Sequence, residues 1–220
     1  MHKILVDIIL RRSGMASISL DFGHGGRDTG AVGHGLQEKD INLNVGLAVG
    51  EILERHDVNV VYTRESDIFV ELEERASIAN RADTDIFVSI HTNGFEDPSA
   101  QGFVTFSYPT SSRGAELAES IHNEVIADET LYTEDRGTKT ENFLVLRETV
   151  MPAALVELAF ITNSEDAEIL RTRQDDFALA IAKGILKYFN IEYEEVQEST
   201  SWLRRAWEWL KTRFARWKRK

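Results

Sequence analysis

Short apolar runs alternate with amphipathic segments along most of this chain. Short runs rich in β-branched residues predict strands, whereas apolar residues spaced by three and four positions predict helices. We predict strands at 18–21, 58–63, 86–90, 102–107, 143–146 and 154–160. Helices are predicted at 41–55, 72–82, 113–127 and 175–190, with Asp40 capping the first and Ser164 capping a further short helix.

This order of elements is typical of an α/β fold. Successive strands separated by helices lie parallel, because each crossover helix must pack on a face of the sheet. We therefore predict a twisted, mostly parallel sheet of about six strands flanked by helices, with an amphipathic helix added at the C-terminus. In such sheets ligands bind at the carboxyl ends of the strands.

Composition divides the chain into four parts. Residues 1–16 form a poorly ordered leader in this interpretation, because their apolar run is short, is broken by Asp7 and precedes its basic pair, unlike a signal peptide. Residues 17–191 form the folded domain. An acidic and then Ser/Thr-rich linker follows at 192–201, and a basic amphipathic helix is predicted at 202–220.

The charge distribution and the missing cysteines narrow the function. The net charge is −12, but the last twenty residues hold eight basic residues and one acidic residue, so the remainder carries −19. So acidic a body is unlike a nucleic-acid binder. Without cysteine, disulfides and thiolate metal sites are excluded, and any metal must be held by His, Asp or Glu. No apolar run approaches the ~20 residues that span a bilayer.

Three of the predicted strands deliver a titratable residue. His24 follows the first strand in a glycine-rich loop that leads to Glu38, His91 follows another strand, and Glu157 lies inside the last one. Burying an unpaired ionisable group is costly, so this placement favours chemistry. Each residue also has a plainer interpretation: a turn or core histidine, a carboxylate at a helix start, or a buried ion pair. The inference therefore depends on the whole set.

The set matches the needs of a zinc hydrolase. A catalytic zinc ion has three protein ligands and one open position, and it lowers the pKa of water. A second carboxylate must then move the proton to the leaving amine. The sequence offers His24, Glu38 and His91 for the metal and Glu157 for the proton. These residues alone support metal-assisted amide hydrolysis.

Five segments resemble, in order and context, the zinc-dependent N-acetylmuramoyl-L-alanine amidases of the Amidase_3 type: GHGGRDTGAVGHGLQEKD, TRESD, ERASIAN, FVSIHTN and ALVELAFITN. The resemblance covers roughly residues 17–190. It implies one zinc ion held by His24, Glu38 and His91, with Glu157 as the catalytic carboxylate. It also implies the substrate, which is the amide between N-acetylmuramic acid and L-alanine in peptidoglycan.

Further residues near these motifs are candidates for supporting roles. Asp21 and Asn93 flank the predicted ligands and could orient them. Arg75 stands at a position typical of the family, where structural hydrogen bonding is the plainer interpretation and contact with substrate the alternative. His34 matches no ligand position, so we predict that it lies on the surface.

The resemblance also implies where the protein acts. We expect synthesis in the cytoplasm without a signal peptide, and action on the cell wall after release or lysis, as a monomer. A phage lysin and a mother-cell autolysin both fit. Two alternatives stay open: a zinc peptidase or deacetylase acting on another amide, and a non-catalytic wall- or membrane-binding module whose zinc is structural.

The C-terminal segment predicts binding to an anionic envelope. Leucine and aromatic residues recur there at heptad-like spacing, and basic residues fill much of the remainder. A basic amphipathic helix with tryptophan on its apolar side is typical of interfacial membrane binders, and anionic wall polymers are a second possible target. Docking on the acidic domain and dimerisation are the alternatives.

Deletion of residues 199–220 tests this prediction. If the tail inserts into membranes, the truncated protein should release far less dye from anionic liposomes than the full chain does. Liposomes of neutral lipid serve as the control. Equal leakage from both proteins would contradict the membrane role and favour docking on the domain.

Overall fold

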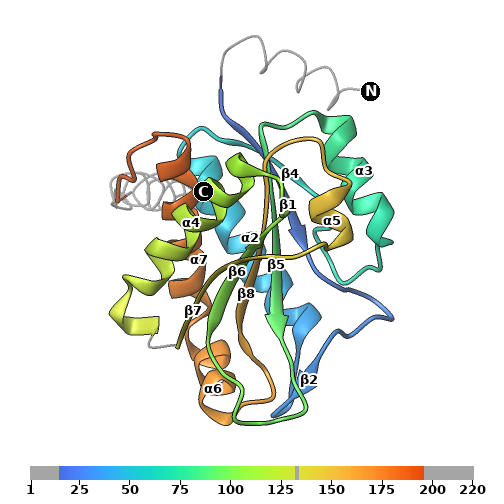
Figure 1. Ribbon diagram of the computed structural model, residues 1–220, viewed down its shortest axis with the longest axis vertical. Helices are drawn as coiled ribbons and strands as arrows, with labels where there is room; N and C mark the ends of the chain where they lie inside the picture. Colours follow the sequence, from blue (N-terminus) through green and yellow to red (C-terminus); the bar gives the residue numbers. More distant parts are fainter. Residues whose placement is uncertain (1–14, 132–133, 196–220) are drawn as a thin grey trace, which may run out of the picture.

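A six-stranded sheet forms the centre of the molecule (Figure 1). The computed structural model describes residues 15–131 and 134–195. The strand order is β4-β1-β5-β8-β6-β7, in which β4, β1, β5 and β8 run parallel while β6 and β7 run the other way. The strands are β1 (Ser17–Phe22), β4 (Asn59–Tyr62), β5 (Ile86–Asn93), β6 (Phe103–Ser107), β7 (Asp135–Thr140) and β8 (Ala153–Phe160). The predicted mostly parallel sheet is confirmed.

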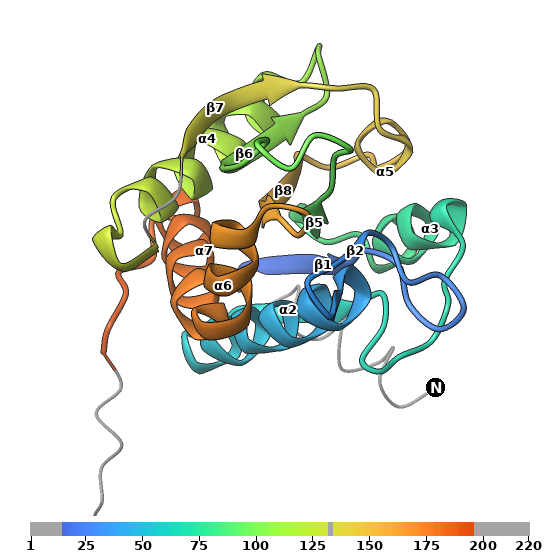
Figure 2. The same ribbon diagram turned by 90° about the horizontal axis from the view of Figure 1, so that it is seen from below.

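Three long helices cover one face of this sheet (Figure 2). They are α2 (Glu38–Arg55), α4 (Ser112–Ile126) and α7 (Gln174–Tyr188), and the shorter α6 (Ser164–Thr172) packs beside α7. Their apolar stripes bury the larger hydrophobic core against the strands. The approach of α2 to β1 is very close, since a Cβ added at Gly46 would lie 2.0 Å from the ring of Phe22.

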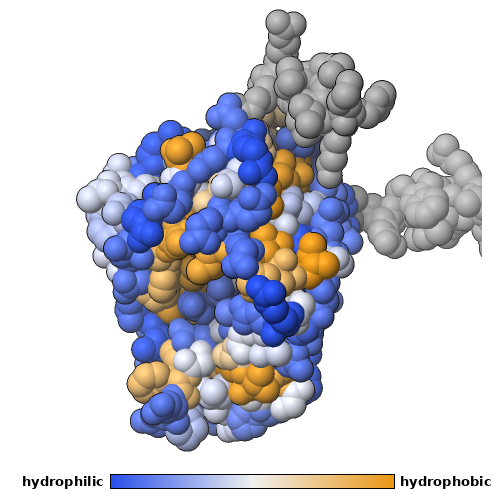
Figure 3. Space-filling view, turned by 90° about the vertical axis from the view of Figure 1, so that its right-hand side faces the viewer, coloured by the Kyte–Doolittle hydropathy of each residue, from blue (hydrophilic) through white to orange (hydrophobic). Residues whose placement is uncertain are grey.

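The opposite face carries a smaller cover. Helices α3 (Leu72–Ala82) and α5 (Leu144–Arg147) pack there against β1 and β8 around a second apolar cluster that includes Phe87 and Leu155. In the described part of the chain, the helix that packs on β6 and β7 is α4, on the other face. Figure 3 looks onto the side of α3 and α5, where apolar surface lies in a hollow between hydrophilic rims.

One predicted strand is wrong, and the strand that replaces it was missed. The run at 143–146 lies mostly in α5, because four apolar residues carry too little periodicity to separate a strand from a buried helical turn. The sixth strand is instead β7, with the polar sequence DRGTKT. It lies at the edge of the sheet and is largely exposed, so it needs no alternating apolar residues.

Both predicted helix caps are also wrong. Helix α2 begins at Glu38 after Gln37, which places Asp40 in the first turn. The N-cap of α6 is Asn163, whose side chain accepts hydrogen bonds from Glu165 N and Asp166 N, so Ser164 is the first helical residue. The predicted helix at 175–190 spans Gln174–Tyr188.

The structure contains two further elements that were not predicted, a short hairpin and a 3-10 turn. A two-stranded hairpin, β2 (Val32–Gly33) and β3 (Leu36–Gln37), precedes α2, and a 3-10 turn, η1 (Glu129–Leu131), follows α4. None of the helices in the described ranges is long and apolar enough to cross a membrane. The predicted C-terminal helix, most of the leader and most of the linker lie outside the described residues.

Candidate metal centre

Three of the predicted residues converge at the carboxyl edge of the sheet. His24 lies in the loop after β1, Glu38 is the first residue of α2, and His91 lies near the end of β5. Their potential ligand atoms all lie within 4.8 Å of one another. Glu38 Oε1 is 3.1 Å from His24 Nε2 and 3.0 Å from His91 Nδ1.

These distances suit a zinc ion. Zinc bonds of about 2.0–2.2 Å in a tetrahedron place neighbouring ligand atoms about 3.4 Å apart, close to the spacing seen here. Imidazole nitrogen and carboxylate oxygen are both common zinc ligands. Within the described ranges, this is the one group of His and acidic side chains close enough to hold a metal ion.

The carboxylate of Glu38 is held from two sides. Its Oε2 accepts a hydrogen bond from Ala31 N at 2.8 Å, and its Oε1 accepts from Thr92 N at 3.1 Å and from Asn42 Nδ2 at 3.2 Å. The residue is only 4% exposed. Burial opposes ionisation, but the two imidazoles outweigh it and hold the pKa of Glu38 far below its usual range.

The two histidines attract protons when no metal is present. Burial disfavours a charged imidazole, but Glu38 and Asp28 outweigh it and raise the pKa of His24 to about 9. Burial also opposes charging of His91, yet its hydrogen bond to Glu38 raises its pKa. A metal ion must therefore displace protons from this centre, so metal binding will weaken as the pH falls.

The loop that carries His24 is strained and firmly held. His24 has a left-handed backbone with φ of +63°, which is uncommon for a residue with a side chain. Arg75 donates hydrogen bonds to the carbonyls of Phe22 at 2.6 Å and His24 at 2.7 Å. Arg64 also donates to the carbonyl of Phe22, at 2.8 Å. Arg75 thus makes structural hydrogen bonds to the His24 loop, and contact with substrate stays a prediction.

Asp21 supports the loop indirectly. It is fully buried and accepts a hydrogen bond from Arg75 Nη1 at 2.8 Å, and from the hydroxyls of Thr63 and Ser89. Burial alone would raise the pKa of Asp21, but Arg75 and the two hydroxyls lower it below its usual value. Its side chain bonds to no predicted ligand, and its hydrogen-bonded link to the His24 loop runs through Arg75.

The other residues near the motifs differ in whether their side chains contact the three converging residues. The side chain of Asn93 accepts a hydrogen bond from Gly94 N and orients none of the three ligands by a hydrogen bond. His34 is exposed on the hairpin, as predicted, with Nε2 3.3 Å from the carbonyl of Thr162. Asp28 was not predicted, yet its Oδ2 lies 2.9 Å from His24 Nδ1. Its position four residues after His24 in the same loop was the available signal.

Glu157 lies next to His91 in the sheet, where the two residues are register partners on the parallel strands β8 and β5. Its Oε2 is enclosed, and no hydrogen-bond partner for it exists among the described residues. Burial raises the pKa of Glu157 to about 7, with a further contribution from Glu38 and an opposing one from the two histidines. A carboxyl group poised near neutrality and free of partners is typical of a general acid or base.

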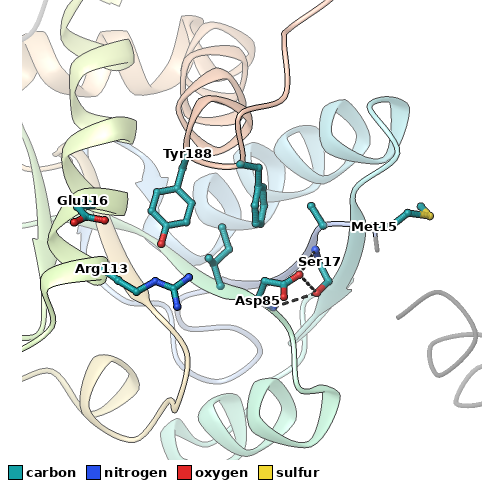
Figure 4. A pocket seen from close by; sticks show the side chains of 9 residues that line it. Met15, Ser17, Asp85, Arg113, Glu116 and Tyr188 are labelled. Atoms are coloured by element: carbon teal, nitrogen blue, oxygen red, sulfur yellow. Dashed lines mark hydrogen bonds between the residues drawn. The ribbon is translucent and has the colours of Figure 1, made fainter. Parts of the chain in front are cut away.

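A separate cavity of about 640 Å³ lies at the other end of the sheet (Figure 4). Ser17 and Asp85, at the amino ends of β1 and β5, line it together with Arg113 and Tyr188. The Ser17 hydroxyl donates to Asp85 Oδ2 at 2.6 Å, so it is already engaged. This cavity lies at the amino edge of the parallel strands, whereas ligands of such sheets bind at the carboxyl edge.

Comparisons with known proteins agree with this geometry. The family profile described as N-acetylmuramoyl-L-alanine amidase matches residues 18–187. The sporulation-specific N-acetylmuramoyl-L-alanine amidase of Bacillus subtilis (strain 168) is 40% identical over 183 residues, covering 81% of this chain and 70% of that protein. The endolysin of Bacillus phage SPP1 is 39% identical over 180 residues, covering 79% and 66%. The solved structure of the amidase AmiC2 of Nostoc punctiforme superposes with a TM-score of 0.76 at 42% identity, covering 80% and 97%.

Replacing Arg75 by methionine should destabilise the whole domain. The variant leaves the buried Asp21 carboxylate without its cation and removes one donor from each of three backbone carbonyls, of which Phe22 O keeps its bond from Arg64. Breaking such a buried pair costs about 3–5 kcal/mol, measurable by urea unfolding. Arg81→Met on the same helix is the control, because Arg81 pairs with Glu74 in solvent and should matter little. Similar losses in both variants would contradict the proposed importance of the buried pair.

Proposed function

The chain belongs to the N-acetylmuramoyl-L-alanine amidase family and is a peptidoglycan amidase, and from that premise we propose how its residues cleave the amide between N-acetylmuramic acid and L-alanine. In this proposal His24, Glu38 and His91 hold one zinc ion, and Glu157 moves the proton. The observation that carries it is the convergence of three metal-ligating side chains beside the half-buried Glu157, whose enclosed Oε2 has no hydrogen-bond partner among the described residues.

The donor set favours a catalytic over a structural metal. Structural zinc sites are closed by four protein ligands, whereas catalytic sites have three and leave one position for water or substrate. The described residues offer three ligands here. When bound, zinc acts as a Lewis acid toward the scissile carbonyl and lowers the pKa of water to near neutrality. A non-catalytic binding module would have no use for the unpartnered Glu157.

Glu157 supplies the proton transfer. In its ionised form the carboxylate accepts a proton from the attacking water, and the resulting carboxylic acid donates that proton to the nitrogen of L-alanine as the C–N bond breaks. Burial raises the pKa of Glu157 to about 7 in the metal-free site, well above that of an exposed glutamate, and this favours a group that both accepts and returns a proton near neutral pH. Its register pairing with His91 supports this role, because it brings Glu157 next to one of the proposed ligands.

The sheet edge beyond Glu157 offers a surface for an extended substrate. Val104 of β6 is the register partner of Glu157, and Phe106 is the partner of Leu155, so these side chains share one face. Val104 is only 2% exposed, so the accessible part of this face is the half-buried Phe106 and strand β7. The exposed Lys139 of β7 lies next to Phe106 on that face. Since α3 and α5 pack on β1 and β8, the outer strands can carry the stem peptide or the glycan. This surface favours a polymer over a small amide.

The site of action and the partners follow from the same proposal. The protein reaches the wall after release or lysis, a route that suits the endolysin among its relatives. The basic segment 202–220 binds anionic membrane or wall polymers, in keeping with its charge. The enzyme works as a monomer, and nucleic acid is not a partner of so acidic a body.

Substitution of Glu157 by glutamine tests the catalytic assignment. The amide keeps the size of the side chain but cannot accept the proton, so lysis of purified sacculi should fall by about 10²–10⁴-fold. Bound zinc and the melting temperature should stay near their wild-type values. A variant that lyses walls as well as the wild type would remove Glu157 from the mechanism.

The products identify the bond that is cleaved. Digestion by the wild type should expose new L-alanine amino termini, and a chelator should abolish them. A different new terminus would indicate a peptidase, and release of acetate would indicate a deacetylase.

The pH dependence of wall hydrolysis should report the ionisation of Glu157. Below its pKa the carboxyl group is protonated and cannot act as a base, so kcat/KM should rise with pH. The midpoint should lie at or below the pKa of about 7 that the metal-free site has, because a bound cation favours the ionised form. Zinc content measured at each pH separates this limb from loss of metal. A rate independent of pH between 5 and 8, at constant zinc content, would contradict the assignment.

A further inference from the structure

We propose that Asp28 is a positioning residue that selects the tautomer of His24 and thereby turns Nε2 of that ring into the metal ligand. The inference rests on the metal site of the proposed function and adds a residue that the five motifs did not single out for any role. It concerns the affinity for the metal and can be measured without any turnover of substrate.

The two nitrogens of His24 face different partners. Nδ1 lies 2.9 Å from Asp28 Oδ2, while Nε2 lies 3.1 Å from Glu38 Oε1 in the metal centre. A neutral imidazole carries one N–H, so Nε2 can offer its lone pair to a metal only when the hydrogen is on Nδ1. An ionised carboxylate accepts hydrogen bonds and donates none. Asp28 therefore stabilises the tautomer that binds metal through Nε2.

Asp28 is itself fixed in the loop. Its Oδ1 accepts a hydrogen bond from Gly30 N at 3.1 Å, which leaves Oδ2 for the ring. Its backbone N and O exchange hydrogen bonds with Gly25 at 3.1 and 2.9 Å. The turn thus fixes the position of the carboxylate, with Oδ1 bonded to Gly30 N and Oδ2 facing the ring of His24.

His91 is oriented in a different way. Its ring packs so closely on Gly23 that a Cβ added there would lie 2.2 Å from His91 Cε1. Within the described chain, its hydrogen-bond partner is Glu38 alone. The ring of His24 is also packed on a glycine, since a Cβ added at Gly30 would lie 2.6 Å from His24 Cδ2. Packing fixes the position of a ring but does not decide which nitrogen carries the hydrogen. Within the described residues, His24 is the one of the two histidines that has a second carboxylate, at the nitrogen facing away from Glu38.

Asp28→Asn discriminates this role from a merely structural one. The asparagine keeps the shape of the side chain but has one acceptor atom, whereas Gly30 N–H and His24 Nδ1–H both require an acceptor. Whichever way the amide turns, one of the two contacts fails. If the amide nitrogen faces the ring, it favours the tautomer with hydrogen on Nε2, which cannot bind metal. A structural role would predict that the isosteric asparagine is tolerated better than alanine.

The experiment measures the zinc dissociation constant of the full chain by competition with a chromophoric chelator. Asp28→Asn and Asp28→Ala should each bind zinc about 10–100-fold more weakly than the wild type, the usual effect of losing a partner of a metal-bound histidine. Long-range ¹H–¹⁵N spectra of the zinc-loaded wild type should show the hydrogen of His24 on Nδ1.

Asp67→Asn is the matched control. Asp67 holds the same loop, accepting from Gly26 N at 2.6 Å and from Lys39 Nζ at 2.7 Å, but it contacts neither histidine. Its variant should bind zinc nearly as tightly as the wild type. The inference is overturned if Asp28→Asn binds zinc within roughly twofold of the wild type, or if both asparagine variants lose affinity equally. A wild type that binds no zinc would instead overturn the metal site of the proposed function.

Discussion

The carboxylate of Glu38 is the interaction on which the candidate site depends. Two imidazoles share its Oε1, and backbone amides of Ala31 and Thr92 hold it from either side. In the metal-free chain His24 disfavours charge on His91, and the buried Glu38 carboxylate outweighs this effect and raises the pKa of His91. A metal cation can then replace the protons with little change of position. The ligands are therefore preorganised, which reduces the reorganisation that metal binding requires.

Two carboxylates in nearby strands, one fully buried and one half-buried, have very different surroundings. Asp21 in β1 is surrounded by Arg75 and two hydroxyls, which keep its pKa low in spite of complete burial. Glu157 in β8 has an enclosed oxygen without a hydrogen-bond partner, and burial raises its pKa to about 7. Both carboxylate oxygens of Asp21 accept hydrogen bonds, so this residue stabilises the loop through Arg75. Leaving Glu157 unsatisfied costs stability and gives a group that can exchange a proton.

The sequence predicted which side chains converge better than it predicted which residues support them. His91 and Glu157 stand out because apolar runs carry them, and that signal is local. The pairing of Asp21 with Arg75 joins residues 54 positions apart, which no periodicity reveals. The contact of Asp28 with His24 was not predicted, because an aspartate in a glycine-rich loop is an ordinary turn residue. Asp28 does have that role as well, since its side chain accepts a hydrogen bond from Gly30 N.

Apolar patterns reveal only the elements that pack on the core, and this explains the errors in the predicted secondary structure. Strands that cross the core carry apolar side chains, so β1, β5 and β8 were predicted close to their true limits. The edge strand β7 has no core to fill, and its polar sequence resembles a loop. Helix α2 begins earlier than its apolar pattern indicates, because Glu38 is turned toward His24 and His91 instead of the core. The spacing of apolar residues reports only which side chains pack on the core, so it could not show that the helix begins at Glu38.

The packing of α2 on β1, away from the candidate site, sets the distance between His24 and Glu38. His24 continues from β1 and Glu38 opens α2, so the separation of that strand and that helix decides whether the two side chains can share a metal. The separation is small because Gly46 presents no side chain to Phe22. A methyl group there would force the helix outward or tilt it, and overpacked cores respond by such shifts. Since ligand atoms tolerate displacements of only a few tenths of an ångström, a glycine two helical turns from the metal centre is part of its geometry.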